Sequence, residues 1–126
     1  MPQGSTTFHE SEEHLSPATR DLHRAIVSLM EELEAVDWYQ QRIDATQDGE
    51  LREILRHNRD EEKEHAAMVL EWIRRRDHAF DAKLREYLFT EGAIVAREDA
   101  LERGGSAAVA GADGTTASVG SLRGGR

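Results

Sequence analysis

A glutamate and a histidine stand three residues apart in the segment RDEEKEHAAM, residues 59–68. At about 100° per residue, Glu62 and His65 point into the same arc of a helix as its apolar side chains, whereas Glu61 and Glu64 point away. Side chains at positions i and i+3 lie about 5 to 6 Å apart, so Glu62 can bridge two metal ions while His65 ligates one. The pattern therefore predicts a metal site; the alternative is an exposed ion pair.

A second inward carboxylate, Glu32, lies on the preceding predicted helix, at the margin of an apolar stripe that includes Leu29 and Val36. Ferritin-like proteins with two iron or two manganese ions take one Glu from each of two helices and a Glu-x-x-His from each of two others. This chain contains half of that set. We therefore expect a twofold homodimer in which Glu32, Glu62 and His65 meet their mates around two metals. Carboxylate and imidazole ligands without sulfur suit iron or manganese, and also zinc.

Other side chains beside these ligands have two interpretations each. Tyr39, at the margin of the same stripe, is either part of the core or a hydrogen-bond donor or redox-active neighbour of the metals. Two outer sets face away from the stripes and are either solvated surface or sites that attract cations where subunits meet: Glu31, Glu34 and Trp38 on the first helix, and His57, Glu61 and Glu64 on the second.

The elements that must hold these residues are helices. Ser16 and Pro17 predict the start of a helix of about 27 residues, and apolar residues then recur at steps of three and four. The segment DATQDGE, residues 44–50, predicts a reversal, and a second helix of matching length is expected over residues 50–76. The fold class is therefore all-α: an antiparallel two-helix hairpin, which dimerises into a ferritin-like four-helix bundle.

Three regions are expected along the chain. Residues 1–15 are polar and unpatterned, which predicts a flexible N-terminus. Residues 16–103 hold the hairpin and a shorter C-terminal amphipathic helix that runs from Phe80 towards Gly92, with a further helical segment in AIVAREDALER. Residues 104–126 are rich in Gly, Ala, Ser and Thr, which predicts a flexible linker.

Composition narrows the function further. Of the 126 residues, 38% are hydrophobic, which is thin for a self-sufficient core and favours partner chains. The net charge of −9 argues against nucleic acid and anionic membranes as partners. The chain has no cysteine, which excludes disulfides and thiolate metal sites. The N-terminal sequence lacks a signal-peptide pattern, and no stretch approaches the roughly 18 apolar residues of a membrane span, so a cytoplasmic location is expected.

Three segments, HRAIVSLMEELEAVDWYQQRIDA, LRHNRDEEKEHAAMVLEWIRR and LREYLFTEG, resemble the encapsulated ferritins, half-length ferritin-like proteins of bacteria and archaea. The resemblance covers residues 22–92. It implies a ferroxidase that oxidises Fe(II) to Fe(III) at a di-iron centre formed across a dimer interface. It also implies annular decamers built from such dimers, held inside an encapsulin shell that stores the mineral.

Carried over position by position, the resemblance assigns two groups of residues. The di-iron ligands fall on Glu32, Glu62 and His65, with Tyr39 beside them. A metal access site at the subunit contact falls on Glu31 and Glu34, with Trp38 adjacent. The alternative from another functional class is a non-catalytic helical scaffold or cargo protein that holds zinc or manganese.

The end of the chain, ASVGSLRGG from Ala117 to Gly125, is similar to the peptide by which this family docks to its shell. Val119 and Leu122 would be the apolar anchors on a flexible tether. The sequence departs from the usual pattern in two places. Ala117 stands where a larger aliphatic residue is common, and two glycines follow Arg123.

Overall fold

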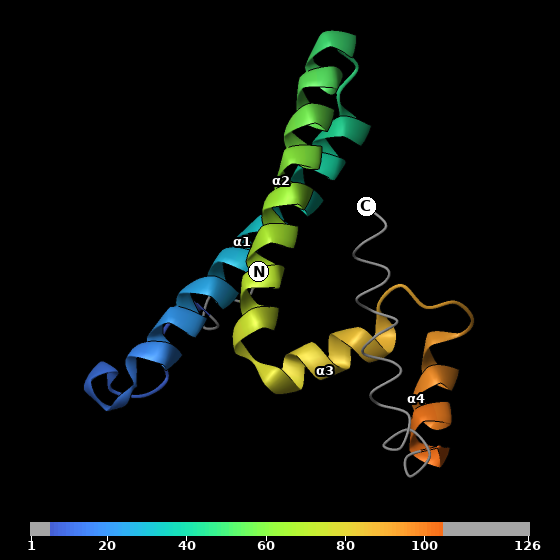
Figure 1. Cartoon of the computed structure of the whole chain (residues 1–126). Helices are drawn as coiled ribbons and strands as arrows, with labels where there is room; N and C mark the ends of the chain where they lie inside the picture. Colours follow the sequence, from blue (N-terminus) through green and yellow to red (C-terminus); the bar gives the residue numbers. More distant parts are fainter. Residues whose placement is uncertain (1–5, 105–126) are drawn as a thin grey trace. The chain divides into compact units, whose positions relative to one another are not determined.

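The computed structural model describes residues 6–104, which contain helices and no strand. A short 3₁₀ helix, η2 (Glu12–His14), precedes α1 (Pro17–Ala45), α2 (Gly49–Arg76), α3 (His78–Tyr87) and α4 (Ile94–Arg103), as Figure 1 shows. The predicted all-α fold is confirmed. Within this part of the chain no helix is both long enough and apolar enough to cross a membrane. Apart from Gly104, the predicted linker and the segment from Ala117 to Gly125 lie outside the described residues.

Local signals at both ends explain why α1 and α2 form a hairpin. The Ser16 hydroxyl accepts a hydrogen bond from the Thr19 amide at 3.0 Å, and Pro17 occupies the first helical position. The Asp48 carboxylate accepts from the Leu51 amide at 2.9 Å and so caps α2. Only residues 46–48 connect the two helices. A connection this short makes the helices antiparallel neighbours.

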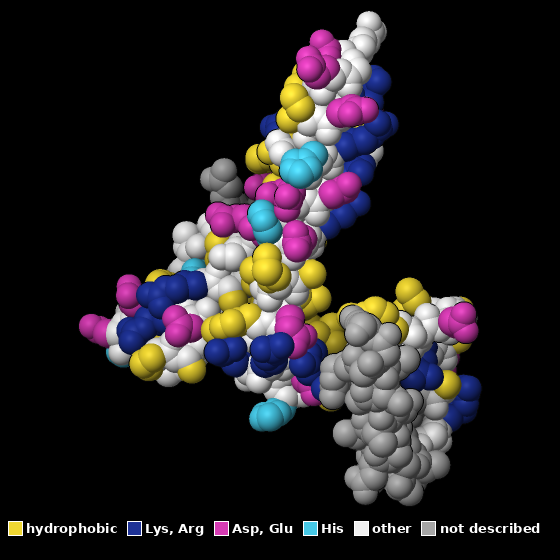
Figure 2. Space-filling view, turned by 45° about the horizontal axis from the view of Figure 1, so that its top comes forward, with side chains coloured by type: hydrophobic (Ala, Val, Ile, Leu, Met, Phe, Trp, Pro, Cys, Tyr) yellow, Lys and Arg dark blue, Asp and Glu magenta, His cyan; other side chains and the backbone are white. Residues whose placement is uncertain are grey.

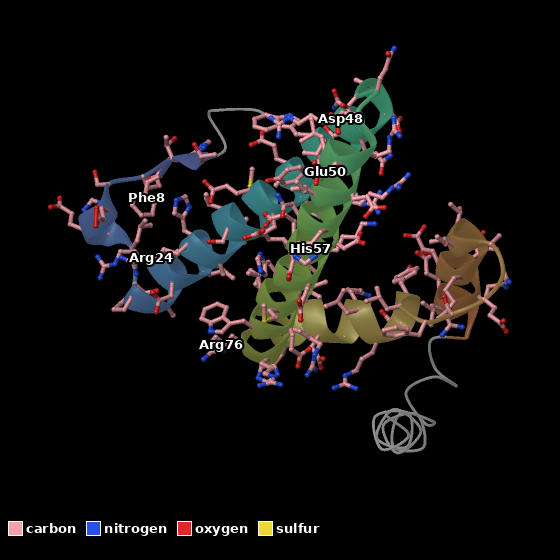
Figure 3. The ribbon with its side chains drawn as sticks, turned by 90° about the horizontal axis from the view of Figure 1, so that it is seen from above. Phe8, Arg24, Asp48, Glu50, His57 and Arg76 are labelled. Atoms are coloured by element: carbon pink, nitrogen blue, oxygen red, sulfur yellow. The ribbon has the colours of Figure 1, made fainter. Side chains whose placement is uncertain are left out.

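Packing between α1 and α2 buries few side chains. Among the described residues, the buried apolar side chains are Ile43, Ala66 and Ile73, of which Ile73 is the most enclosed at 1% exposure. The helices lie side by side near their connection and diverge towards the other end (Figures 1 and 3). Large apolar side chains on both helices stay exposed: Ile26, Leu33, Trp38, Leu51, Ile54 and Met68. One chain therefore does not cover its own apolar stripe.

The segment before α1 folds back onto it. The ring of Phe8 lies 4.4 Å from the ring of His23, centroid to centroid, and Figure 3 shows Phe8 beside the first turns of α1. The guanidinium of Arg20 donates to the backbone carbonyl of Glu12 at 3.4 Å. These contacts attach two residues from within the segment predicted to be flexible, residues 1–15, to the first part of α1.

The described residues divide into two compact units, with the boundary between His78 and Ala79. In the second, the Arg97 side chain of α4 donates to the backbone carbonyl of Glu86 at 2.9 Å, which ties α4 to the end of α3. The third helix ends at Tyr87, earlier than the amphipathic pattern to Gly92 predicts. The reason is local: Phe89 adopts a left-handed backbone conformation with φ of 59°, and such a residue terminates a helix.

Candidate metal centre

Glu32 on α1 and the Glu62–His65 pair on α2 come together part-way along the hairpin. Nδ1 of His65 lies 3.3 Å from Oε1 of Glu62 and 3.6 Å from Oε2 of Glu32. One ligand atom from each side chain lies within 4.8 Å of the other two. Figure 2 shows acidic and histidine side chains gathered in this part of the hairpin. Among residues 6–104, these three form the one group of three or more histidine and acidic side chains that can reach a single metal ion.

The two carboxylates affect one another's charge. The pKa of Glu32 is raised, first because its carboxyl shares a hydrogen bond with the Glu62 carboxyl, then because burial disfavours its charged form, and then because Glu62 repels it. His65 acts in the opposite direction and does not reverse the shift. Two like charges held this close, with only one imidazole beside them, leave the site short of positive charge.

The donor set fits a divalent cation. Oε2 of Glu32 is buried and has no hydrogen-bond partner, since Nδ1 of His65 lies beyond hydrogen-bond distance. Leaving a buried acceptor unpaired costs about 1 to 3 kcal/mol. A cation ligated by this oxygen, by Glu62 and by His65 would satisfy the acceptor and offset the repulsion. Carboxylate oxygens with one imidazole nitrogen are a ligand set that iron, manganese and zinc accept.

Tyr39 lies on α1, two turns from Glu32, and its side chain is half-buried. The guanidinium carbon of Arg42 lies 5.5 Å from the centre of its ring, within the range of a cation–π contact. The role of Tyr39 beside the metals stays a prediction.

The residues of the predicted access site lie on the outer side of α1. Glu31 and Trp38 are exposed, and Glu34 is half-buried. In the described part of one chain, neither glutamate joins a group of three that could hold a metal. Trp38 lines a surface hollow of about 300 Å³ with Gln41 and Arg42. A site at Glu31 and Glu34 therefore needs side chains from another subunit and stays a prediction.

His57 and Glu61 pair with each other on the outer side of α2. Nε2 of His57 lies 3.4 Å from Oε1 of Glu61, four residues along the helix. His57 and Glu64 are both exposed. The three do not form a metal-capable group in the described chain. This geometry favours the interpretation of His57, Glu61 and Glu64 as solvated surface over a cation site.

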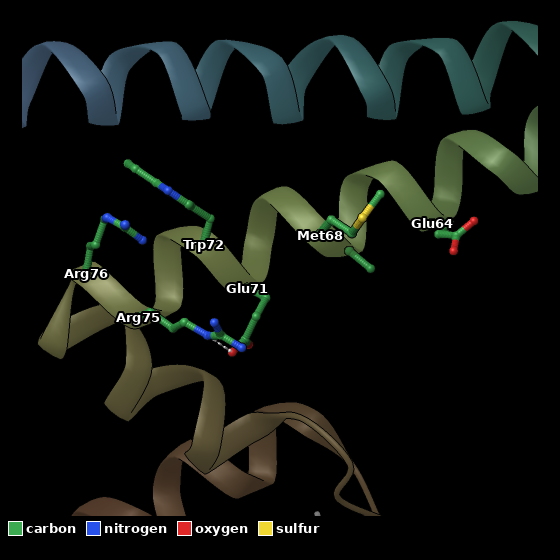
Figure 4. A pocket seen from close by; sticks show the side chains of 7 residues that line it. Glu64, Met68, Glu71, Trp72, Arg75 and Arg76 are labelled. Atoms are coloured by element: carbon green, nitrogen blue, oxygen red, sulfur yellow. Dashed lines mark hydrogen bonds and ion pairs between the residues drawn. The ribbon is translucent and has the colours of Figure 1, made fainter. Parts of the chain in front are cut away.

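A larger hollow of about 540 Å³ lies on another part of α2 (Figure 4). Its charges are paired within the helix. Glu71 accepts from Arg74 and from Arg75 at 2.7 Å each, and these bonds lower the pKa of Glu71 to about 2. The Arg76 guanidinium stacks on Trp72 at 4.1 Å. None of the three ligands lines this hollow, so it is separate from the metal site.

One polar contact between α1 and α2 near the site cannot be predicted from sequence periodicity. Arg59 on α2 donates to the side chain of Gln40 on α1 at 2.7 Å. Gln40 follows Val36 of the apolar stripe by four residues, and Arg59 precedes Glu62 by three residues, so each residue can be placed on its own helix from the sequence. Their pairing depends on the register of one helix against the other, which periodicity does not determine.

The sequence of this chain matches one family model and several curated proteins. The EncFtn-like family model matches residues 7–91, which include the whole hairpin and all three ligands. A protein from Rhodospirillum rubrum named "Encapsulated ferritin-like protein" is 55% identical, over 98% of this chain and 93% of its own length. The "Encapsulin nanocompartment cargo protein EncC" of Myxococcus xanthus is 38% identical, over 85% of each chain.

A solved structure agrees with these matches. The crystal structure of protein ne0167 from Nitrosomonas europaea superimposes with a TM-score of 0.68, at 64% sequence identity. The match covers 69% of this chain and 96% of that one. Fold, family model and relatives therefore agree with the resemblance noted in the sequence, and the chain belongs to the EncFtn-like family of encapsulated ferritins.

Proposed function

We propose that this protein is a ferroxidase, which oxidises Fe(II) to Fe(III) at a di-iron centre shared by two copies of the chain. The convergence of Glu32, Glu62 and His65 between α1 and α2 carries the proposal. These are the ligand types of ferritin-like di-iron proteins, and one chain supplies half of the usual set.

A homodimer would complete the centre. Two copies related by a twofold axis supply four carboxylates and two imidazoles, and four negative charges balance two divalent cations. The exposed apolar side chains of the hairpin, among them Leu33 and Leu51, are the surface that such a partner would cover. Assembly of these dimers into an annular decamer follows the resemblance to the family.

Each ligand has a distinct task in this proposal. Glu62 and His65 would hold iron from α2, with the carboxylate shared between two ions and the imidazole on one, and Glu32 would supply the buried oxygen that lacks a partner. Each Fe(II) gives up one electron, and dioxygen accepts these electrons together with protons from water. The carboxylates shift around the product as its charge rises. Tyr39 stands beside the centre as a hydrogen-bond donor or redox-active neighbour, and Glu31 and Glu34, with Trp38 adjacent, attract Fe(II) at the subunit contact.

The ferric product would be stored outside the ring of hairpins. A ring of hairpins encloses no cavity for mineral, so ferric product passes to an encapsulin shell in the cytoplasm, to which residues 117–125 dock. The name of the Myxococcus xanthus relative, a nanocompartment cargo protein, supports this partner. Co-expression with the shell protein tests it: the full chain should be encapsulated, and a Leu122→Asp variant should be left outside. Equal encapsulation of both would contradict the role of the peptide.

The activity is tested by anaerobic Fe(II) titration followed by oxygen. Wild type should bind two iron ions per dimer and oxidise them, and Glu32→Ala and His65→Ala should slow oxidation at least about tenfold. His57→Ala, which removes an exposed histidine from the same helix, is the matched control and should keep the wild-type rate. Unchanged rates in both ligand variants would exclude this centre. A metal that raises thermal stability without turnover would instead support the zinc or manganese scaffold.

A further inference from the structure

The Arg59–Gln40 link is a side-chain hydrogen bond that joins α2 to α1. Nη1 of Arg59 donates to Oε1 of Gln40 at 2.7 Å. Both ends are held by further bonds: Gln40 Nε2 donates to Asp44 at 3.2 Å, and Arg59 Nε donates to Asp60 at 3.1 Å. The Arg59 side chain is only 19% exposed. The hydrogen bond itself lies at the surface, where Gln40 is exposed, but most of the Arg59 side chain is covered and its guanidinium has a partner on the facing helix.

The link lies one turn from Glu62 on α2 and two turns from Glu32 on α1. Arg59 precedes Glu62 by three residues, a spacing that sets their Cβ atoms about 5 to 6 Å apart. Gln40 follows Tyr39 directly on α1. Towards the connection, the Arg52 guanidinium also joins the helices, by donating to the backbone carbonyls of Ile43 and Thr46. The helices are therefore tied by polar contacts from their connection up to one turn before Glu62 on α2, and up to two turns from Glu32 on α1.

Register matters to this site because its ligands come from both helices. A slip of one residue moves a helix by 1.5 Å along its axis. A shift of that size would separate Glu32 from Glu62 and His65, whose ligand atoms lie within 4.8 Å of one another. The apolar core offers little resistance, since only three apolar side chains of the described hairpin are buried. The Arg59–Gln40 hydrogen bond, one turn from Glu62, resists the axial slip that the sparse core does not prevent.

We infer that Arg59 is a positioning residue: through its bond to Gln40 it fixes the register of α2 on α1 and so holds Glu62 and His65 opposite Glu32. The inference rests on the proposed function insofar as these three residues bind metal. It goes beyond that function because it attributes part of the metal affinity to Arg59, a residue that does not touch the metal. Contacts that orient metal ligands typically cost 10- to 100-fold in affinity when they are removed.

The test measures metal binding rather than turnover. Co(II) alone is titrated into the full chain without oxygen, and its visible absorption reports both affinity and ligand geometry. The variants are Arg59→Met, Gln40→Met, the double variant and Arg59→Lys. Arg56→Met is the matched control, because Arg56 is an exposed arginine one turn away on the same helix and its loss changes the charge equally. Thermal unfolding and size-exclusion chromatography monitor folding and association of every variant.

Arg59→Met and Gln40→Met should each weaken Co(II) binding about tenfold and change its absorption band. The double variant should be no weaker than either single variant, since one link is lost in all three. Arg59→Lys should restore part of the affinity, because an ammonium can reach Gln40 but cannot bond Asp60 in the same fork. Arg56→Met should bind as wild type does.

The inference is overturned if Arg59→Met keeps the wild-type affinity and spectrum, if the two single effects add in the double variant, or if Arg56→Met behaves like Arg59→Met. Should Arg59→Met fail to fold, the uncharged exchange Gln40→Met decides alone. A different result would contradict the proposed function. If Co(II) binding to wild type does not depend on Glu32 and His65, the site itself is wrong; if it does and the link variants are normal, only the positioning role falls.

Discussion

His65 on α2 holds its Nδ1 atom 3.6 Å from Oε2 of Glu32 on α1. The contact exists because two helices of nearly equal length, 29 and 28 residues, are joined by a short connection and fold back on one another. It leaves a buried carboxylate oxygen without a hydrogen bond and near a second carboxylate. This arrangement is unfavourable without a cation and would become favourable with one, which supports the proposed metal site.

Glu32→Gln should therefore stabilise the metal-free protein. The folded-state pKa of Glu32 is raised, so its stability contribution is most favourable at low pH and turns unfavourable as the pH rises through that pKa. A neutral amide removes the repulsion from Glu62, and we expect a gain of about 1 kcal/mol at pH 7. Thermal unfolding in the presence of a chelator measures it.

The same variant should lose its response to metal. Saturating Mn(II), at about 100 times its dissociation constant, should stabilise wild type by about 2.7 kcal/mol and Glu32→Gln by much less. Glu53→Gln, an exposed glutamate exchange on α2, serves as the control and should respond like wild type. A metal-free Glu32→Gln protein that melts below wild type would contradict the repulsion argument.

Disrupting the apolar face of the hairpin should abolish both association and iron oxidation. Leu51 is 45% exposed, and at about 100° per residue it lies on the same face of α2 as Glu62. Leu51→Asp places a charge on the surface that a partner would cover. We expect monomers by sedimentation and at least a tenfold slower oxidation of Fe(II).

Ile94→Asp is the matched control for this experiment, because Ile94 is an exposed apolar residue of α4 outside the hairpin. It should leave the hairpin dimer and its rate intact. An active Leu51→Asp monomer would show that one chain suffices, which conflicts with a shared centre.

Acid should remove a stabilising ion pair at the end of α2. Bonds from Arg74 and Arg75 lower the pKa of Glu71 from 4.5 to about 2. A depressed acid pKa contributes stability above the unfolded value, and this contribution is lost as the pH falls from 4.5 through 2. Because the Glu71 side chain is 39% exposed, the contribution is no more than about 1 kcal/mol. Glu71→Gln should thus melt below wild type at pH 7, and the difference should shrink towards pH 2.5; a difference independent of pH would exclude the ion pair as its source.

Removing the cap of α2 should destabilise the hairpin near its connection. The Asp48 carboxylate accepts the hydrogen bond of the Leu51 amide. Asp48→Ala should cost about 1 kcal/mol, measured by urea unfolding, whereas Asp48→Asn should cost little because asparagine caps nearly as well. Equal losses in both variants would point to the charge of Asp48 rather than to its hydrogen bond.

Much of this architecture is predictable from local patterns. Ser16 and Pro17 predict the observed start of α1, and apolar residues at steps of three and four predict both long helices. The inward directions of Glu32, Glu62 and His65 follow from the same periodicity, and the structure brings the three together. Helical geometry relates residues on one helix, so a short hairpin connection is enough to bring the two sets face to face.

What local patterns miss depends on register and on backbone conformation. The Arg59–Gln40 link requires a particular axial offset between α1 and α2. The end of α3 depends on the left-handed conformation of Phe89, which its residue type does not favour. The predicted site at Glu31 and Glu34 would need side chains from another chain, so neither the sequence pattern nor the structure of one chain tests it.

The three-residue connection between α1 and α2 also affects how quickly the metal centre forms. Closing so short a loop takes well under a microsecond, and helices form within about a microsecond. The hairpin should therefore appear almost at once, whereas pairing two hairpins depends on collisions and slows in proportion to dilution. In the proposed dimer, freshly made chains at low abundance would be folded yet unable to oxidise iron. Confinement of many copies in a shell raises their local concentration and would keep the centres assembled.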